Sequence, residues 1–455
     1  MRNKSLTARP MTPWRIALSR PTGKPEAQGF AMSQGWGGSS VGRSSATLEW
    51  ELRVAHVPAG ASARPPPWQS GAWEFLYSSE EWNAPELRQA WQAMIAERSN
   101  PRLIYQTPGW FDHLTSLQSQ DPIAVAVTRD RSGQVNGLAP FRIASGTLDF
   151  HVSEHTLARI PVRKALMLGG LPLLPENEAV VDRLFDWMWS FLPKVGGISL
   201  SGVEVGSFLW RYLHSSKALR KRYFVHVVEG IRPYYVLPLP KTFEEYLAHY
   251  NAKKRYNLKR QIKILRELGG GRLELRRIDS PDDAQRLLDA EALMAPNPRR
   301  FSGLGGKQAD SFWTRRKIVD MAERGFLRSY VLTCGDEPIS LIKGLQYGTT
   351  YSALQTLYRK DYASLSPGAA CQHLVVEDLL KYRPAQLIDF GFGEPNEKHH
   401  TSNVTLQMAC VLLLRKTLGN RIRAGAHAAF FSAVRAAKLI RGRIKSPNRS
   451  EPCAT

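Results

Sequence analysis

One stretch of the sequence, residues 327–390, constrains the fold more than any other. Three short apolar runs within 327–358 are separated by the turn sequences GDEP and YGTT, which is typical of antiparallel strands joined by tight turns. A Ser-Pro-Gly turn follows at Ser366, then a helix-length run to Leu380 and a further short apolar run at 386–390. The stretch therefore predicts an antiparallel meander followed by a turn, a helix and one more strand.

A similar order of elements occurs earlier in the chain. Residues 81–98 and a segment entered at Pro108 have helical patterns, and apolar runs at 123–128 and 134–141 flank the turn sequence RDRSG. A helix and a short strand follow before about residue 230. Because 455 residues are too many for one ordinary core, we expect two α/β (α+β) domains that arose by tandem duplication.

This duplication predicts four regions. After Pro240 the pattern restarts with a helix over 243–268 that ends at Gly269. The expected division is a Gly/Ser/Pro-rich disordered tail at 1–70, domains at 71–238 and 239–420, and a basic amphipathic helix and tail at 421–455.

The net charge of +22 is concentrated at the two ends of the chain. Residues 1–70 hold nine Lys/Arg against three Asp/Glu, and residues 415–455 hold ten against one, so the ends carry 15 of the 22 charges. Basic tails fit association with RNA, with acidic polymers or with an anionic membrane surface, and they also fit plain solvation. The body between them is only mildly basic.

Cysteine spacing and hydropathy bear on whether the chain has disulfides, a metal site or a membrane helix. Cys334, Cys371, Cys410 and Cys453 are widely separated and form no Cys-x-x-Cys or Cys/His cluster, so we expect neither a disulfide framework nor a metal site. No apolar run approaches the roughly 18 residues of a membrane helix. These features predict a soluble cytoplasmic protein with no transmembrane segment.

The turn before the last predicted helix is a candidate anion site. Ser366 suits an N-cap, Pro367 suits the first helical position, and Gly368 and Ala369 leave little side chain there. Free N–H groups and the helix dipole would favour an anionic ligand such as a pyrophosphate. The same residues also fit an ordinary capped helix start without a ligand.

Three segments resemble a known family. The run SPGAACQHLVVEDLL followed by IDFGFGEPNEK, the helix PKTFEEYLAHYNAKKRYNLKRQIKILRE, and QTPGWF with the PIAVAV and GLAPF strands resemble the BioF2/CelD-like and FemAB-like group of tandem GNAT acyltransferases. The likeness covers about residues 73–420. It implies tandem GNAT-like domains, each a twisted mixed, largely antiparallel sheet flanked by helices, with a scaffold role for the first domain and the active cleft in the second.

The resemblance also implies an acyl-CoA donor, such as acetyl-CoA, and no metal. The donor's arm would lie between the strands at 351–358 and 386–390, although the loop reads LSPGAA in place of the usual Gln/Arg-x-x-Gly-x-Gly/Ala. Five consecutive residues would cradle the donor's phosphates or backbone: Ser366, Pro367, Gly368, Ala369 and Ala370.

Candidate catalytic residues lie near the predicted cleft. In GNAT-type chemistry an amine or hydroxyl attacks the acyl carbonyl directly, so a base, an oxyanion donor and a proton for the leaving group are needed. Glu394 is a candidate base, as is His399 or His400. Lys398 is a candidate for binding an anion or the oxyanion, and Tyr358 for protonating the leaving group.

Each of these residues also has a structural interpretation. Glu394 can simply fix a Gly-rich turn, and the His399-His400 pair can belong to a surface loop. Asp389 can cap a backbone N–H group.

Two basic helices suggest further partners. Within 253–268, Leu258, Ile262 and Leu265 predict a buried face, and the row Arg255, Lys259, Lys263 and Arg266 beside it fits the phosphates of tRNA or of a nucleotide-linked acceptor or a solvated surface. A helix at 424–445 is basic and amphipathic, which fits either a membrane surface or packing on the second domain.

Three functions remain in view from the sequence. The first is an N- or O-acyltransferase that uses an acyl thioester and acts on a small-molecule or saccharide acceptor of envelope or polysaccharide biosynthesis. The second is a FemAB-like transferase that takes an aminoacyl group from charged tRNA. The third is a non-catalytic binding protein on a degenerate GNAT scaffold.

Overall fold

The computed structural model describes residues 73–445, except 77, 99, 117–121, 153–154, 295–313 and 393–402. The predicted tail at 1–70 therefore lies outside the described residues.

The first half of the chain alternates strands and helices. Its elements are β1 (Trp73–Leu76), α2 (Ser79–Trp82), α3 (Pro85–Ala96), η2 (Leu103–Gln106), α4 (Pro108–Ser116), β2 (Ile123–Arg129), β3 (Val135–Val152), β4 (His155–Met167), α5 (Glu178–Phe191), β5 (Gly197–Glu204), α6 (Phe208–Ser215), α7 (Lys217–Arg222) and β6 (Tyr223–Pro238).

The second half repeats this order. Its elements are α8 (Phe243–Ala248), α9 (Ala252–Leu268), β7 (Leu273–Ile278), η3 (Pro281–Asp283), α10 (Ala284–Met294), α12 (Arg315–Glu323), β8 (Ser329–Cys334), β9 (Glu337–Tyr347), β10 (Thr350–Tyr358), η5 (Lys360–Leu365), α13 (Pro367–Lys381), β11 (Leu387–Phe392), β12 (Val404–Arg415) and α15 (Leu418–Lys445).

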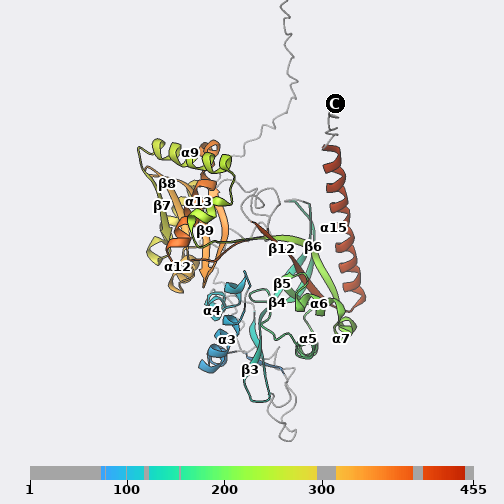
Figure 1. The fold of residues 1–455 in the computed structure, drawn as a ribbon. Coiled ribbons are helices and arrows are strands. Elements are labelled where there is room, and N and C mark those ends of the chain that lie inside the picture. Colours follow the sequence, from blue (N-terminus) through green and yellow to red (C-terminus); the bar gives the residue numbers. More distant parts are fainter. Residues whose placement is uncertain are drawn as a thin grey trace, which may run out of the picture. The chain divides into compact units, whose positions relative to one another are not determined.

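All twelve strands belong to one sheet with the order β1-β2-β3-β4-β5-β12-β6-β11-β10-β9-β8-β7. From each edge inward, four antiparallel strands are followed by a fifth that pairs in parallel, β4 with β5 and β10 with β11. A helix precedes this fifth strand in each half, α5 or α13 (Figure 1). The duplication predicted from the sequence is therefore confirmed in the topology.

The two halves exchange their last strands at the centre of the sheet. β6 ends the first half in the sequence but pairs with β11 of the second half, and β12 ends the second half but pairs with β5 of the first. β6 and β12 also pair with each other along most of their lengths. The predicted domain boundary at residue 239 thus separates segments that remain joined by strand pairing.

Buried apolar clusters lie on both faces of each half. In the second half, Leu357 packs with Leu341 and Ile318 on the face of α10 and α12. Tyr351 and Ile388 pack on the opposite face with buried residues of α13. Alternation gives β10 one face toward α13 and another toward α10, and the irregularity between Ala353 and Gln355 shifts the alternation so that Tyr351 and Leu357 lie on opposite faces.

Two expected elements differ in extent. The helix predicted over 243–268 is broken between α8 and α9, because Asn251 has an extended backbone and its side chain accepts a hydrogen bond from Lys254 N to start α9 anew. The strand predicted at 134–141 extends to Val152 and forms a long hairpin with β4, which the polar residues beyond Phe141 concealed.

The C-terminal helix α15 packs on the strands β3, β6 and β12 (Figure 1). Among the side chains of α15 whose burial is described, Asn420, His427 and Phe431 are buried, and His427 Nδ1 lies 3.0 Å from Nε2 of the buried His226 on β6. Of the two arrangements expected for this helix, packing on the folded body is therefore observed, although on strands of both halves.

Candidate functional site

Two neighbouring strands of the second half part near the middle of the sheet. β10 and β11 pair in parallel only at three positions, from Thr350 with Leu387 to Ser352 with Asp389. Immediately beyond, β10 has an irregularity between Ala353 and Gln355, and β11 has one between Asp389 and Gly391. Because bulges bend a strand and raise its local twist, the two strands diverge from this point.

The helix α13 begins beside the open end of this divergence. Ser366 occupies the N-cap position with φ 50° and ψ 53°, in the left-handed region, and among the described residues no side chain caps the first turn. Ser366 thus occupies the N-cap position expected from the sequence, but its side chain does not cap the helix, because a capping side chain normally goes with extended backbone angles. The Ser366 carbonyl accepts hydrogen bonds from Ala369 N at 3.0 Å and Ala370 N at 3.2 Å.

Gly368 holds the start of α13 close to β10. A Cβ atom added at Gly368 would lie 3.5 Å from Thr356 Cγ2 and 3.5 Å from Tyr358 Cδ1. A side chain longer than a methyl group would therefore enter the space between the helix and the strand. The structure thus places Tyr358, the candidate for protonating the leaving group, beside the Ser366 to Ala370 turn.

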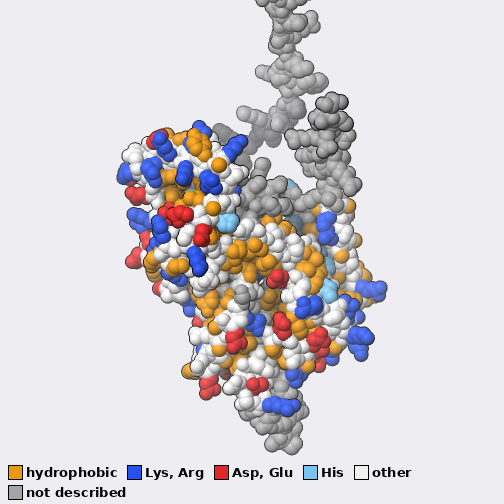
Figure 2. All heavy atoms as spheres, viewed as in Figure 1, with side chains coloured by type: hydrophobic (Ala, Val, Ile, Leu, Met, Phe, Trp, Pro, Cys, Tyr) orange, Lys and Arg blue, Asp and Glu red, His pale blue; other side chains and the backbone are white. Residues whose placement is uncertain are grey.

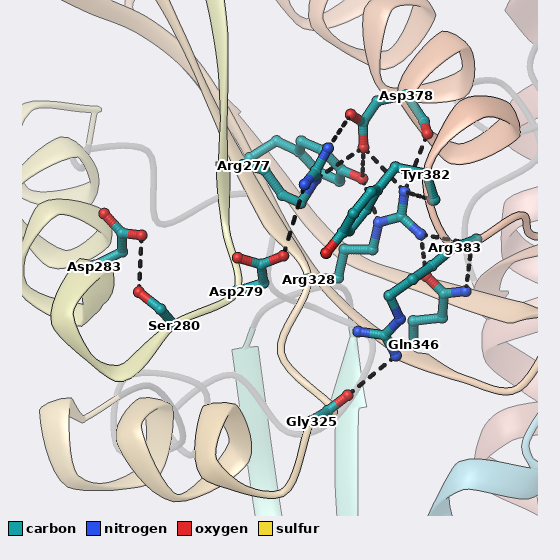
Figure 3. Close-up of polar contacts among 11 residues, drawn as sticks. Arg277, Asp279, Ser280, Asp283, Gly325, Arg328, Gln346, Asp378, Tyr382 and Arg383 are labelled. Carbon is teal, nitrogen blue, oxygen red and sulfur yellow. Dashed lines mark hydrogen bonds and ion pairs between the residues drawn. The ribbon is translucent and has the colours of Figure 1, made fainter.

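The other end of α13 is anchored by a buried arginine (Figure 3). The guanidinium of Arg328, which is fully buried and immediately precedes the strand β8, donates to the carbonyls of Asp378, Tyr382 and Arg383 and to the Asp378 carboxylate. Arg277 donates to the same carboxylate at 2.6 Å. Although burial acts to raise the pKa of Asp378, hydrogen bonds from Arg277, Arg328 and Tyr330 lower it overall.

This anchoring distinguishes the two ends of the helix. At the C-terminal end, Arg328 binds the Asp378 carbonyl of the last turn and the two carbonyls that follow the helix, those of Tyr382 and Arg383. At the N-terminal end, the first turn has no side-chain cap and faces a gap between strands. Such a helix start can receive an anionic ligand while its far end stays fixed.

A buried polar cluster lies at the base of the divergence, on the face of β10 and β11 opposite α13. The hydroxyl of Tyr234 on β6 donates to Asp389 Oδ2 at 2.7 Å, and Ser352 Oγ lies 3.5 Å from the same oxygen. Asp389 Oδ1 accepts from Gly391 N at 2.7 Å, so the predicted backbone cap exists but is one part of a larger network. Burial, followed by the Asp389 charge, raises the pKa of Tyr234.

The first half of the chain contributes to the same cluster. Tyr105 of η2 interacts with Ser352 through its hydroxyl, and burial together with the Asp389 charge raises the pKa of Tyr105. Of this cluster, only Asp389 was predicted from the sequence, as a backbone cap. Tyr234, Ser352 and Tyr105 were missed because β6, β10 and η2 share no sequence motif.

A second ionic pair lies on this face of the sheet. Lys343 of β9 is buried and forms an ion pair with Glu291 of α10. Lys343 is the register partner of Gln355 on β10. The buried Nε2 of Gln355 has no hydrogen-bond partner among the described residues. Polar groups therefore continue from the base of the divergence along the strand β10.

Three of the four predicted catalytic residues, Glu394, Lys398 and His399, lie outside the described residues. Tyr358 is described and is half-buried, but six residues separate it from Ser352. At about 3.3 Å per strand residue this is about 20 Å. Tyr358 therefore stands at the start of α13, far from the Ser352–Asp389 base of the divergence.

The helix α9 presents a basic surface near this site. It packs on α13 and on η5, the segment that leads into α13, and Figure 2 shows its lysines and arginines gathered at that end of the molecule. Six of its cationic side chains are exposed: Lys253, Lys254, Lys259, Arg260, Lys263 and Arg266.

No helix within the described residues is both long and apolar enough to cross a membrane. Those residues also hold no cluster of three or more His, Cys, Asp or Glu side chains arranged for a metal ion.

The second half matches a known domain family. Residues 252–399 fit the family described as "Acetyltransferase (GNAT) domain". This range spans α9 to β11 and thus includes the diverging strands and α13. No curated protein matches the chain in sequence.

Several solved structures are similar to the chain at low identity. FemX is 12% identical over 75% of this chain and 97% of its own, with a TM-score of 0.46. A conserved protein of unknown function from Bacteroides thetaiotaomicron is 15% identical over 72% and 97%, with a TM-score of 0.44. A tandem GNAT protein from the clavulanic acid biosynthesis pathway is 9% identical over 75% and 98%, with a TM-score of 0.41.

Proposed function

Because residues 252–399 form a GNAT-type acyltransferase domain, we propose that this chain transfers an acyl group, acetyl or longer, from acyl-CoA or a similar thioester to an amine or hydroxyl. The observation that carries the proposal is the divergence of β10 and β11 beside the uncapped start of α13. As acceptor we propose a small molecule or saccharide precursor of the envelope or of a polysaccharide, modified in the cytoplasm.

The donor would lie along β10. Its phosphates would face the Ser366 to Ala370 turn, where the helix dipole favours negative charge, and its arm would run between β10 and β11. The thioester would then stand near Ser352 and Asp389, at the base of the divergence. Backbone groups released from strand pairing by the two bulges are available to hold the donor's amides and the carbonyl that is attacked.

Direct acyl transfer requires an acceptor nucleophile, a proton acceptor and a proton for the departing thiolate. Glu394 or His399 remains our proposed base, and Lys398 our proposed anion or oxyanion donor. Tyr358 lies at the phosphate end of the donor path, so we propose that it contacts the donor there and that leaving-group protonation falls to another group.

The exposed cations of α9 favour a second candidate function. A helix with six exposed Lys/Arg that packs against the segment entering α13 suits a polyanionic donor such as aminoacyl-tRNA. Charge reversal of Lys259 and Lys263 should then weaken tRNA binding and reduce its salt dependence. Lys217 and Lys221 on α7 are exposed with the same spacing, and their reversal is the matched control.

Thermal unfolding of the full chain with ligands distinguishes the candidates. Coenzyme A, acetyl-CoA, a long-chain acyl-CoA and bulk tRNA would be compared. A ligand at about one hundred times its Kd adds roughly 2.7 kcal/mol to the stability of the folded state, enough to raise the Tm by a few degrees. A shift with an acyl-CoA supports the thioester donor. A salt-sensitive shift with tRNA alone replaces it by the tRNA-dependent function, and no shift with any ligand contradicts both.

A further inference from the structure

One arginine of the first half lies over the central strands of the sheet. Arg102 precedes η2, and its side chain packs against β5, where a Cβ added at Gly202 would lie 2.7 Å from Arg102 Nε. Gly202 has φ +78° at a register irregularity between β5 and β12. A larger residue there would occupy the space that the arginine now fills.

The surroundings of Arg102 are aromatic and weakly anionic. Its guanidinium carbon is 5.3 Å from the ring centre of Tyr105 and 5.9 Å from that of Tyr234. Desolvation acts to lower its pKa, but Tyr234, Tyr105, Asp389 and Cys410 raise it overall. Arg102 is therefore a cation in the folded protein.

The hydrogen-bonding capacity of this cation is poorly used. Arg102 Nε is buried and has no hydrogen-bond partner. Within the described part of the chain, no carboxylate or carbonyl accepts from its guanidinium. A buried donor without an acceptor costs about 1 to 3 kcal/mol, so such a group invites a functional explanation.

A second arginine adjoins the same region. Arg232 of β6 donates to Glu229 at 3.0 Å, and its Nη2 is 3.9 Å from Cys410 Sγ on β12. Among the described residues, its buried Nε also has no hydrogen-bond partner. Two arginines of the first half, each with an unused donor, thus interact with the same thiol of β12.

This region is separate from the proposed phosphate site. Arg102 interacts with Tyr105 and Asp389, which lie at the base of the divergence, on the face away from α13. The start of α13 is about 20 Å along β10 from that base. An anion at Arg102 would therefore belong to the acceptor that meets the thioester, since the donor's phosphates lie elsewhere.

We infer that Arg102 binds a negatively charged group, a carboxylate or a phosphate, of the acceptor substrate. The guanidinium fork matches either oxyanion with two parallel hydrogen bonds, and Arg232 adds positive charge nearby. The inference rests on the proposed function, and it gives the first half a substrate-binding role in place of the scaffold role expected from the sequence.

Anion binding to the full chain tests this inference. Malonate represents a carboxylate and inorganic phosphate represents a phosphate group of the acceptor. Chloride keeps the ionic strength constant, and the Kd of each anion is measured by calorimetry and by the rise in Tm. Wild type should bind at least one of them, and Arg102→Met should weaken that binding about tenfold or more. Preference for malonate or for phosphate then identifies the acceptor's group as a carboxylate or a phosphate.

Two controls keep the result interpretable. Arg415→Met removes an arginine whose Nε and Nη2 donate to the Val195 and Leu192 carbonyls. This variant should have a lower Tm than wild type but the same Kd for the anion. Arg102→Lys, which keeps the charge, replaces Arg102→Met if that variant does not fold, and should bind the anion more weakly than wild type does.

Three outcomes would overturn the inference. They are no binding of either anion by wild type, equal binding by the Arg102 variant, and binding that Gly368→Glu removes but Arg102→Met does not. The last outcome would assign the anion to the donor site and so leave the proposed function intact. If wild type bound an anion at Arg102 but did not bind coenzyme A, the inference about Arg102 would stand and the proposed thioester donor would be contradicted.

Discussion

The helices α5 and α13 occupy the same place in the two halves, between the fourth and fifth strands, and their C-terminal ends are held in the same way. Arg415 of β12 donates to the carbonyls of Trp189 and Leu192 at the end of α5. Arg328, immediately before β8, does the same for the end of α13. A cation on the last carbonyls satisfies orphan acceptors and complements the helix dipole.

Their N-terminal ends differ. Asn177 caps α5 with its side chain, which accepts from Ala179 N at 2.9 Å and Val180 N at 3.3 Å. Ser366 at the start of α13 has left-handed backbone angles and does not cap. The first helix satisfies its own first turn, whereas the second leaves that turn for another group.

The pairing between the fourth and fifth strands also differs between the two halves. In the first half, the chain that follows β4 remains bonded to β5, with Ser201 N donating to Gly170 O at 2.8 Å. A Cβ at Gly170 would lie only 2.5 Å from Ser201 O, so backbone itself fills the space. In the second half both strands bulge and part. One architecture thus has a closed copy, in which the chain after the fourth strand stays bonded to the fifth, and an open copy, in which the two strands part; the proposed donor lies in the open copy.

The largest effect should come from removing the shared anchor. Arg328→Met leaves three carbonyls and the Asp378 carboxylate without their buried partner, and should cost about 3 to 5 kcal/mol of unfolding free energy. Arg415→Met, whose arginine is half-buried, should cost about 1 to 3 kcal/mol. Urea unfolding measures both. Equal losses would mean that the two anchors do not differ as their burial indicates.

The open and closed copies should differ most in donor binding. Gly368→Glu places a carboxylate in the space beside Tyr358 and should weaken coenzyme A binding a hundredfold or more, about 2.7 kcal/mol. Ala179→Glu makes the equivalent change at the exposed second position of α5 and should leave the Kd unchanged. Calorimetry with both variants checks this, and a loss of affinity in Ala179→Glu would refute the assignment.

Each half also carries a buried histidine held neutral. Burial lowers the pKa of His226 to about 4, with a smaller effect from His427, and burial lowers that of His373 on α13 to about 4. In the unfolded chain the pKa of each histidine is near 6.5. The contribution of each neutral histidine to the unfolding free energy is therefore complete above pH 6.5, and about 2 to 3 kcal/mol per group is lost as the pH falls toward 4. His226→Gln and His373→Gln should each flatten this pH dependence of the unfolding free energy.

The smallest effects should appear at the two helix caps. Asn177→Ala should destabilise the protein by about 1 kcal/mol. Ser366→Ala should change stability little, because no cap is lost, and Ser366→Gly should be neutral or stabilising by up to about 1 kcal/mol, since glycine tolerates φ 50°. Thermal unfolding of the three variants measures these effects. If Ser366→Ala destabilised the protein as much as Asn177→Ala does, the proposed difference between the two helix starts would be wrong.

The duplicated order of elements was readable from the sequence because the strands and turns of 327–390 are short, apolar and separated by Gly-containing turns. The strand exchange was not, because pairing of β6 with β11 and of β12 with β5 depends on contacts between residues more than 140 positions apart. Local patterns carry no information about such partners.

Only the part of the candidate site that has a local sequence pattern was predictable. The Ser366 to Ala370 turn has a local signature of helix initiation, and the structure places it beside Tyr358 and the diverging strands. The cluster of Arg102, Tyr234 and Asp389 joins three separate segments and has no motif. The left-handed Ser366 was missed because serine at an N-cap normally predicts a side-chain cap.

Hydrogen exchange with and without acetyl-CoA tests the central claim, that only the second half holds an open donor site. The amides of 353–371, which form the diverging part of β10 and the start of α13, should become protected on adding the ligand. The equivalent amides of the first half, 167–181, should exchange at the same rate in both states. Protection of 167–181, or no protection of 353–371 at saturating ligand, would contradict the account.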